Sequence, residues 1–152
     1  MQKSVWGPAT WKLLHTMVIK INNDVSISQI NDLKSIILRI VSNLPCPYCT
    51  SHAISYITNS NYKLIQNIND LRYFIFTFHN NVNKRLNKPV ITYEEHLQLY
   101  NMPLRTVALN FFEIYTTKNT GVTMMLYNFH RKNMIQDLRL YFKNNQSLYN
   151  FN

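Results

Sequence analysis

Apolar residues recur three and four positions apart along most of this chain, and this spacing constrains its fold more than any other feature. The alternation of apolar and polar residues that marks a half-buried strand is absent throughout. The sequence therefore predicts an all-α protein. The predicted helices cover residues 6–21, 28–44, 47–56, 69–88, 91–100 and 104–114, with one or two further helices through 125–142.

The clearest helical pattern lies in residues 69–88, which end before Pro89. Asn69 or Asp70 is predicted to cap this helix, because short polar side chains accept hydrogen bonds from the free amides of a first turn. A turn is predicted at residues 118–121. The buried face of the 69–88 helix is predicted to comprise Leu71, Phe74, Ile75, Phe78, Val82 and Leu86.

Length and composition bound the kind of protein. The 152 residues suffice for about one domain with a real core. Only two glycines occur, so the glycine-rich loops that cradle dinucleotides and triphosphates are excluded. The net charge of +9 comes from scattered basic residues, which favours a solubility role over a dedicated nucleic-acid surface. No apolar run approaches the roughly 20 residues of a membrane span, and no signal peptide is recognisable, so a cytosol-like compartment is expected.

The chain's two cysteines stand together in Cys46-Pro47-Tyr48-Cys49. Two thiols at this spacing form a redox-active disulfide or half of a metal site. Cys49 falls in the first turn of the predicted third helix, where the free amides and the helix dipole favour a thiolate. We therefore expect an inner Cys49 with a lowered pKa and an outer Cys46 open to attack, as in a thiol–disulfide exchange site.

The motif is compatible with two other kinds of site. CPYC is also the active-site string of glutaredoxins, but that fold needs a strand before the motif, and a helix is predicted there. Cys46, Cys49 and His52 form a candidate zinc ligand set, with His79 or His96 as a fourth ligand. No second pair of closely spaced ligands accompanies them, so redox chemistry is favoured.

Polar residues also lie beside apolar faces on two other predicted helices. His79, Asn80 and Asn83 share one face of the 69–88 helix, and Trp11 and His15 lie one turn apart on the first helix. Composition alone favours an internal polar network for His79, Asn80 and Asn83 and a satisfied core pair for Trp11 and His15. The alternative is a site for a flat, polar ligand.

Three motifs in this order, WGPATWKLLH, then CPYC, then FHNNVNKRLNKP, resemble the Erv/ALR family of FAD-dependent sulfhydryl oxidases. The resemblance covers about residues 6–95, and its wording is most similar to the short members encoded by large double-stranded DNA viruses. It implies a four-helix bundle that binds FAD, plus a short fifth helix, within residues 1–100. Residues 101–152 would form a helical extension packed on this domain.

The resemblance also implies roles for individual residues. Cys46 and Cys49 would be catalytic, with Cys49 nearer the flavin and Cys46 exchanging with substrate. Electrons from protein dithiols would pass through the cysteine pair to FAD and then to dioxygen, yielding disulfides and hydrogen peroxide. No metal ligands are implied. The cofactor-binding residues would be Gly7, Trp11, His15, Cys49, His79, Asn80, Val82, Asn83, Leu86, Lys88 and Tyr93, the last standing where many relatives carry Trp.

Many cellular relatives carry a second, shuttle pair of cysteines, and this sequence has none. The expected substrate is therefore a dithiol protein, thioredoxin-like or from the virion, that reaches Cys46 directly. A homodimer is expected, without membrane or nucleic-acid binding, in the cytoplasm of the infected host cell or packaged in the virion. The alternatives are a zinc module using Cys46, Cys49 and His52 to engage an acidic partner or nucleic acid, and an inactive scaffold that retains FAD.

Overall fold

The computed structural model describes residues 1–117 and 122–152, and for residues 122–127 it describes the backbone alone. The predicted turn at 118–121 lies outside the described residues. Within them the chain is all-helical, with no sheet and one isolated antiparallel bridge between Ile21 and Tyr149, so the prediction of an all-α protein is confirmed. The helices are α1 (Lys3–Lys20), α2 (Ile27–Val41), α3 (Pro47–Thr58), η1 (Tyr62–Leu64), α4 (Ile68–Arg85), α5 (Tyr93–Leu99), α6 (Leu104–Tyr115), α7 (Val122–Asn144) and η2 (Gln146–Leu148).

Helix boundaries follow local capping chemistry. Ser26 and Gln29 form a reciprocal capping box at the start of α2. The predicted cap of α4 is wrong, because Asn67 accepts the Asp70 backbone N–H instead. The helix begins earlier than predicted since Ile68 is buried in the core, which leaves Asp70 inside the first turn facing the positive end of the helix dipole. The C-terminal segment forms one helix, α7, where one or two were predicted.

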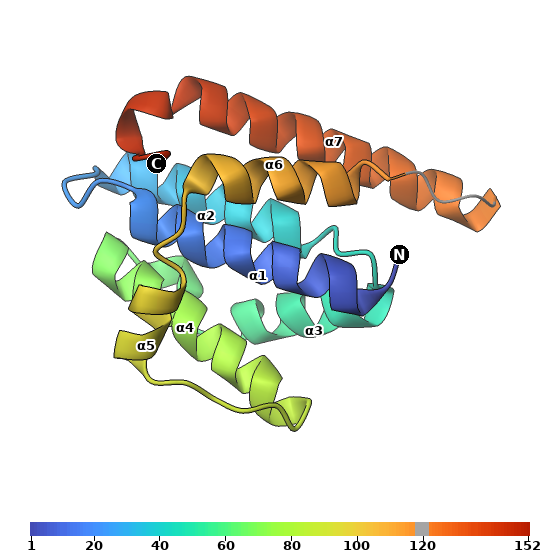
Figure 1. The fold of residues 1–152 in the computed structure, drawn as a ribbon, viewed down its shortest axis with the longest axis horizontal. Helices are drawn as coiled ribbons and strands as arrows, with labels where there is room; N and C mark the ends of the chain where they lie inside the picture. Colours follow the sequence, from blue (N-terminus) through green and yellow to red (C-terminus); the bar gives the residue numbers. More distant parts are fainter. Residues whose placement is uncertain (118–121) are drawn as a thin grey trace.

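The elements form three layers, which Figure 1 shows from the side. The central layer holds α1 and α2, with α3, α4 and α5 on one side and α6 and α7 on the other. Helix α1 contacts both α4 and α6, so it lies at the centre of the packing. One continuous cluster of buried side chains extends from Trp6 to Tyr149. The predicted division into 1–100 and 101–152 stays a prediction, but both parts contribute to one core.

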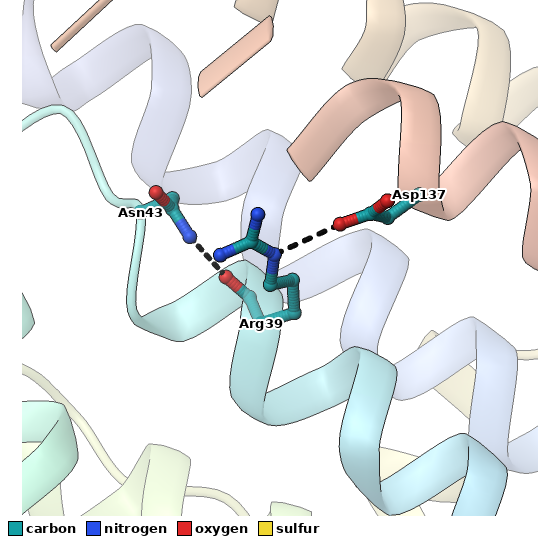
Figure 2. A network of polar contacts seen from close by, with 3 residues as sticks. All are labelled: Arg39, Asn43 and Asp137. Carbon is teal, nitrogen blue, oxygen red and sulfur yellow. Dashed lines mark hydrogen bonds and ion pairs between the residues drawn. The ribbon is translucent and has the colours of Figure 1, made fainter. Parts of the chain in front are cut away.

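The C-terminal helices are attached to the rest of the fold at several points. Backbone hydrogen bonds join Asn22 to Leu148 and Asn150 to Lys20, next to the end of α1. Figure 2 shows the contact between α2 and α7, where Arg39 Nε lies 2.9 Å from a carboxylate oxygen of Asp137 and Asn43 donates to the Arg39 carbonyl. Both side chains of this ion pair are largely exposed, so the pair contributes little to stability beside the buried core.

None of the helices in the described part of the chain combines the length and apolar character needed to cross a membrane.

Candidate functional site

The two cysteines occupy the start of α3. Pro47 takes the first helical position, which suits its fixed φ and missing N–H. Cys46 is the N-cap, and its Sγ accepts the backbone N–H of Cys49 at 3.2 Å. Both thiols are free and half-buried. Cys49 lines the large cavity described below, whereas Cys46 lies outside its wall.

The expected pKa asymmetry of these thiols is reversed. Burial favours a raised pKa at Cys46, but hydrogen bonds from the side chain and backbone of Cys49 and the charge of Lys3 outweigh it, so the pKa of Cys46 is lowered. Burial raises the pKa of Cys49, and the neighbouring Cys46 adds to this effect against Lys3 and Arg85. The prediction of a lowered pKa at Cys49 is therefore wrong. The backbone N–H of Cys49, which stabilises a thiolate, points at the Sγ of the N-cap residue Cys46 and not at the Cys49 sulfur.

A cavity of about 640 Å³ lies beside Cys49, between α1, α3 and α4. Its volume falls within the roughly 300–1,000 Å³ usual for small-molecule sites. Aromatic rings form much of its wall. Trp11, Tyr56, Phe78, His79 and Tyr100 all contribute.

Trp11 and His79 form a stacked pair in this wall. Their rings stack with centroids 4.0 Å apart and planes 9° apart. Behind them, His15 Nε2 lies 2.7 Å from His79 Nδ1, so one imidazole donates to the other. Burial, followed by the charges of His96 and Lys88, lowers the pKa of His79 to about 4. His79 is therefore neutral at neutral pH, and the nitrogen that accepts this hydrogen bond, on whichever ring it lies, must be unprotonated.

A third histidine completes this buried cluster. The ring of His96, from α5, meets His15 edge-on with centroids 4.3 Å apart, and the Tyr100 ring stacks on His15 with centroids 4.1 Å apart. Burial lowers the pKa of His96 to about 4, and burial with His96 and His79 lowers that of His15 well below its usual range. His15 Nδ1 and His96 Nε2 are buried, and neither has a hydrogen-bond partner within the described part of the chain.

The charge around the cavity is of one sign. Lys3, Lys12, Arg85 and Lys88 contribute to its lining, and none of the lining residues that the structure describes is Asp or Glu. Lysine and arginine side chains together suit a ligand that carries phosphate groups.

The structure brings most of the predicted cofactor-binding residues to this one cavity, although their roles in binding stay predictions. His15 lies behind His79. The side-chain amide of Asn80 binds the backbone of Ile91: its Nδ2 donates to the Ile91 carbonyl at 3.0 Å, and its Oδ1 accepts the Ile91 N–H at 3.4 Å. Tyr93 packs on Tyr73, Phe76 and His96 instead of lining the cavity. The predicted residues that do line it are Gly7, Trp11, Cys49, His79, Val82, Asn83, Leu86 and Lys88.

Other lining residues were missed by the sequence-based prediction. Tyr56 follows Cys49 by two helical turns, so its place on the same face of α3 was available from spacing alone. Tyr100 follows the short helix α5, and no local pattern marks it as part of a site. Further missed residues are Lys3, Trp6, Thr10, Lys12, Leu44, Ala53, Phe78 and Arg85.

His52 lines the cavity and meets the Tyr48 ring edge-on at 4.5 Å. Among the residues that the structure describes, no three His, Cys, Asp or Glu side chains are grouped to hold a metal ion. His52 therefore does not join Cys46 and Cys49 in a ligand set. The geometry therefore does not support the predicted zinc site at Cys46, Cys49 and His52.

Comparison with protein families places this thiol pair and most of the cavity lining within one matched segment. The model of the Erv1/Alr family matches residues 8–101, more than half of the chain. The chain belongs to the Erv1/Alr family. The matched part ends at the turn after α5, so α6 and α7 lie outside the Erv1/Alr match.

The chain is also similar to viral proteins whose names describe FAD-linked sulfhydryl oxidases. The chain is 37% identical over 99 residues to an FAD-linked sulfhydryl oxidase of African swine fever virus, covering 65% of this chain and 82% of that protein. It is 34% identical over 100 residues to a putative FAD-linked sulfhydryl oxidase of invertebrate iridescent virus 3, covering 65% and 68%. A probable FAD-linked sulfhydryl oxidase of monkeypox virus is 30% identical over 82 residues, covering 54% and 83%.

Proposed function

We propose that this chain is an FAD-linked sulfhydryl oxidase in which Cys46 exchanges with substrate thiols and Cys49 connects the exchange to a flavin held in the cavity. Membership of the Erv1/Alr family and the names of the viral relatives support the activity. The observation that carries the assignment of roles is positional. Cys49 lines the aromatic cavity, and Cys46, one helical turn away, does not.

The residues of the cavity fit FAD. Its flat aromatic lining suits a ring system, and its cations suit a diphosphate. A Cβ added at Gly7 would meet only Lys3, at 3.9 Å, so the protein leaves this wall open to a ligand. Trp11, His79, Val82 and Leu86 would contact the ring systems, and Lys12 and Lys88 the phosphates. When bound, FAD accepts the two electrons of a dithiol and passes them to dioxygen, which becomes hydrogen peroxide.

The cysteines carry out the exchange. A substrate thiolate attacks Cys46 Sγ of the Cys46–Cys49 disulfide, the S–S bond breaks, and Cys49 leaves as a thiolate. A second substrate thiol, once deprotonated, attacks the substrate sulfur of the mixed disulfide and displaces Cys46. The substrate has then lost two electrons and two protons, and the cysteine pair has gained the two electrons. The lowered pKa of Cys46 assists the second step, because a more acidic thiol is a better leaving group.

The substrates follow from access to Cys46. The only cysteines of the chain are this pair, so protein dithiols must reach Cys46 directly. Thioredoxin-like proteins and virion proteins are the proposed substrates. We further propose a homodimer, acting in the cytoplasm of the infected cell or within the virion, which sedimentation of the purified protein and fractionation of infected cells would test.

The decisive experiment compares purified Cys46→Ser and Cys49→Ser proteins with the parent chain. The parent protein should show the visible absorption of a bound oxidised flavin, which bleaches with dithiothreitol and returns in air. Each Cys→Ser variant should keep the flavin absorption and lose dithiol oxidation. Ser51→Ala, an exposed change on the same helix, serves as the matched control and should retain both. Full oxidation by either Cys→Ser variant, or a parent protein without flavin, would overturn the proposal.

A further inference from the structure

The surface around Cys46 has a defined chemical character. Tyr48 lies between the two cysteines with 68% of its surface exposed, which is unusual for a large aromatic side chain. The Arg85 guanidinium lies over its ring, 6.0 Å from the centroid, and reaches it from the end of α4. Lys3, at the start of α1, lines the same cavity as Cys49 and Arg85, and its charge favours the thiolate of both cysteines. We call Lys3, Tyr48 and Arg85 the basic rim.

No negative charge balances this rim from the helices that build it. Helices α1 and α3 contain no Asp or Glu, and α4 contains only Asp70 in its first turn. Arg85 ends α4, about 22 Å further along the helix at 1.5 Å per residue. The acidic residues of the chain are Asp24, Asp32, Asp70, Glu94, Glu95, Glu113 and Asp137.

A bound diphosphate accounts for only part of this charge. Lys12 and Lys88 also line the cavity and suffice in number for two phosphate groups. Lys3 and Arg85 are exposed, and the charge of Lys3 acts on both sulfurs whereas that of Arg85 acts on Cys49. Their fields therefore extend into the solvent from which a substrate must approach Cys46. Among the described ion pairs neither residue has a carboxylate partner, since the only pair is between Arg39 and Asp137.

We propose that the basic rim binds an extended segment of the substrate in which Asp or Glu residues flank the reacting cysteines. This inference rests on the proposed function and names its substrate class. Complementary charge raises the rate of encounter, and the exposed Tyr48 ring offers the segment a flat apolar contact beside Cys46. The same cations attract the substrate thiolate itself, whose negative charge is needed for attack.

The test measures kcat/KM of the flavin-loaded enzyme for three synthetic peptides that share one Cys-x-x-Cys core. Glu, Gln or Lys flanks the core, and dithiothreitol serves as an uncharged reference dithiol. At low salt the Glu peptide should exceed the Lys peptide by about tenfold or more. The difference should shrink when added salt shortens the Debye length to about 8 Å.

Variants of the basic rim test whether Lys3 and Arg85 cause the preference for the Glu peptide. In Lys3→Gln and Arg85→Gln, kcat/KM for the Glu peptide divided by kcat/KM for dithiothreitol should fall several-fold. This ratio cancels any effect of these lining residues on the flavin. Lys63→Gln removes one exposed positive charge from η1, which follows the C-terminal end of α3, opposite the end that carries the cysteines. This variant should leave the ratio unchanged.

The outcomes separate the two claims. Oxidation of dithiothreitol with equal kcat/KM for the three peptides, or with preference for the Lys peptide, would overturn the inference and leave the proposed function standing. Failure to oxidise dithiothreitol would overturn the proposed function itself.

Discussion

The hydroxyl of Tyr115, at the end of α6, lies 2.6 Å from Thr10 Oγ1 in α1. Thr10 donates its single proton to the Trp6 carbonyl at 2.7 Å, so Tyr115 must be the donor in this contact. Trp6 and Thr10 both line the cavity, and Arg131 of α7 is close enough for its charge to act on Tyr115. The helices outside the Erv1/Alr match thus support the wall of the cavity from behind.

Replacing Tyr115 with Phe should therefore weaken the fold at this wall. The lost hydrogen bond should lower the free energy of unfolding by about 0.5–1.5 kcal/mol. Urea denaturation of Tyr115→Phe, Thr10→Val and the double variant forms a cycle that isolates the contact. Simple additivity of the two single changes would show that the hydroxyls do not interact.

The C-terminal helices should be needed for folding of the whole chain. Phe111 is fully buried and stacks on Tyr115 with centroids 4.0 Å apart. Phe111→Ala should lower the free energy of unfolding by about 3–5 kcal/mol, with one cooperative transition. Leu109→Ala on the same helix removes a side chain that is 59% exposed and should change it by less than about 0.5 kcal/mol. A Phe111→Ala protein whose α1–α5 core unfolded at its normal urea concentration would show that α6 is an independent appendage.

Stability should fall as the pH falls from about 6.5 towards 4. The pKa values of His79 and His96 are lowered to about 4 in the folded chain, whereas unfolded histidine titrates near 6.5. Between these values the unfolded state binds more protons, so stability rises with pH across this window and is complete above it. Thermal unfolding from pH 4.5 to 7.5 measures this slope.

The variant His96→Phe supplies the control for this pH dependence. Phe keeps a ring against His15, Phe76, Tyr93 and Tyr100 and removes a buried nitrogen that has no partner. It should fold and show a smaller loss of melting temperature at acid pH. An unchanged pH slope in His96→Phe would assign the effect to other groups.

Substitutions at Asn80 and Asn83 should affect different properties: the first the stability of the fold, the second the binding of the cofactor. Asn80 holds Ile91 through two hydrogen bonds, and Asn83 lines the cavity. Asn80→Ala should lower the free energy of unfolding of the flavin-free protein by about 1 kcal/mol. Asn83→Ala should leave this energy within about 0.5 kcal/mol but lower the flavin retained per chain after dialysis. If Asn80→Ala lost as much flavin as Asn83→Ala and kept the parent's stability, Asn80 would instead contact the cofactor directly.

The sequence by itself determined the helices and the thiol chemistry. Periodicity, proline and capping residues act over a few neighbours, so they marked the start of α3 at Pro47 and the buried face of α4 through Phe78. The Cys46–Cys49 spacing and the ordered motifs also identified the family before any coordinates.

Only the tertiary structure decided which side chains meet. A helical pattern specifies a face but not its partner, so it did not show that Asn80 turns to Ile91 or that His96 packs on His15. It also did not assign the lowered pKa to Cys46, because that shift depends on where one amide points. Residues far apart in the chain, such as Lys3, Tyr48 and Arg85, come together through packing of α1, α3 and α4, which no local interaction specifies.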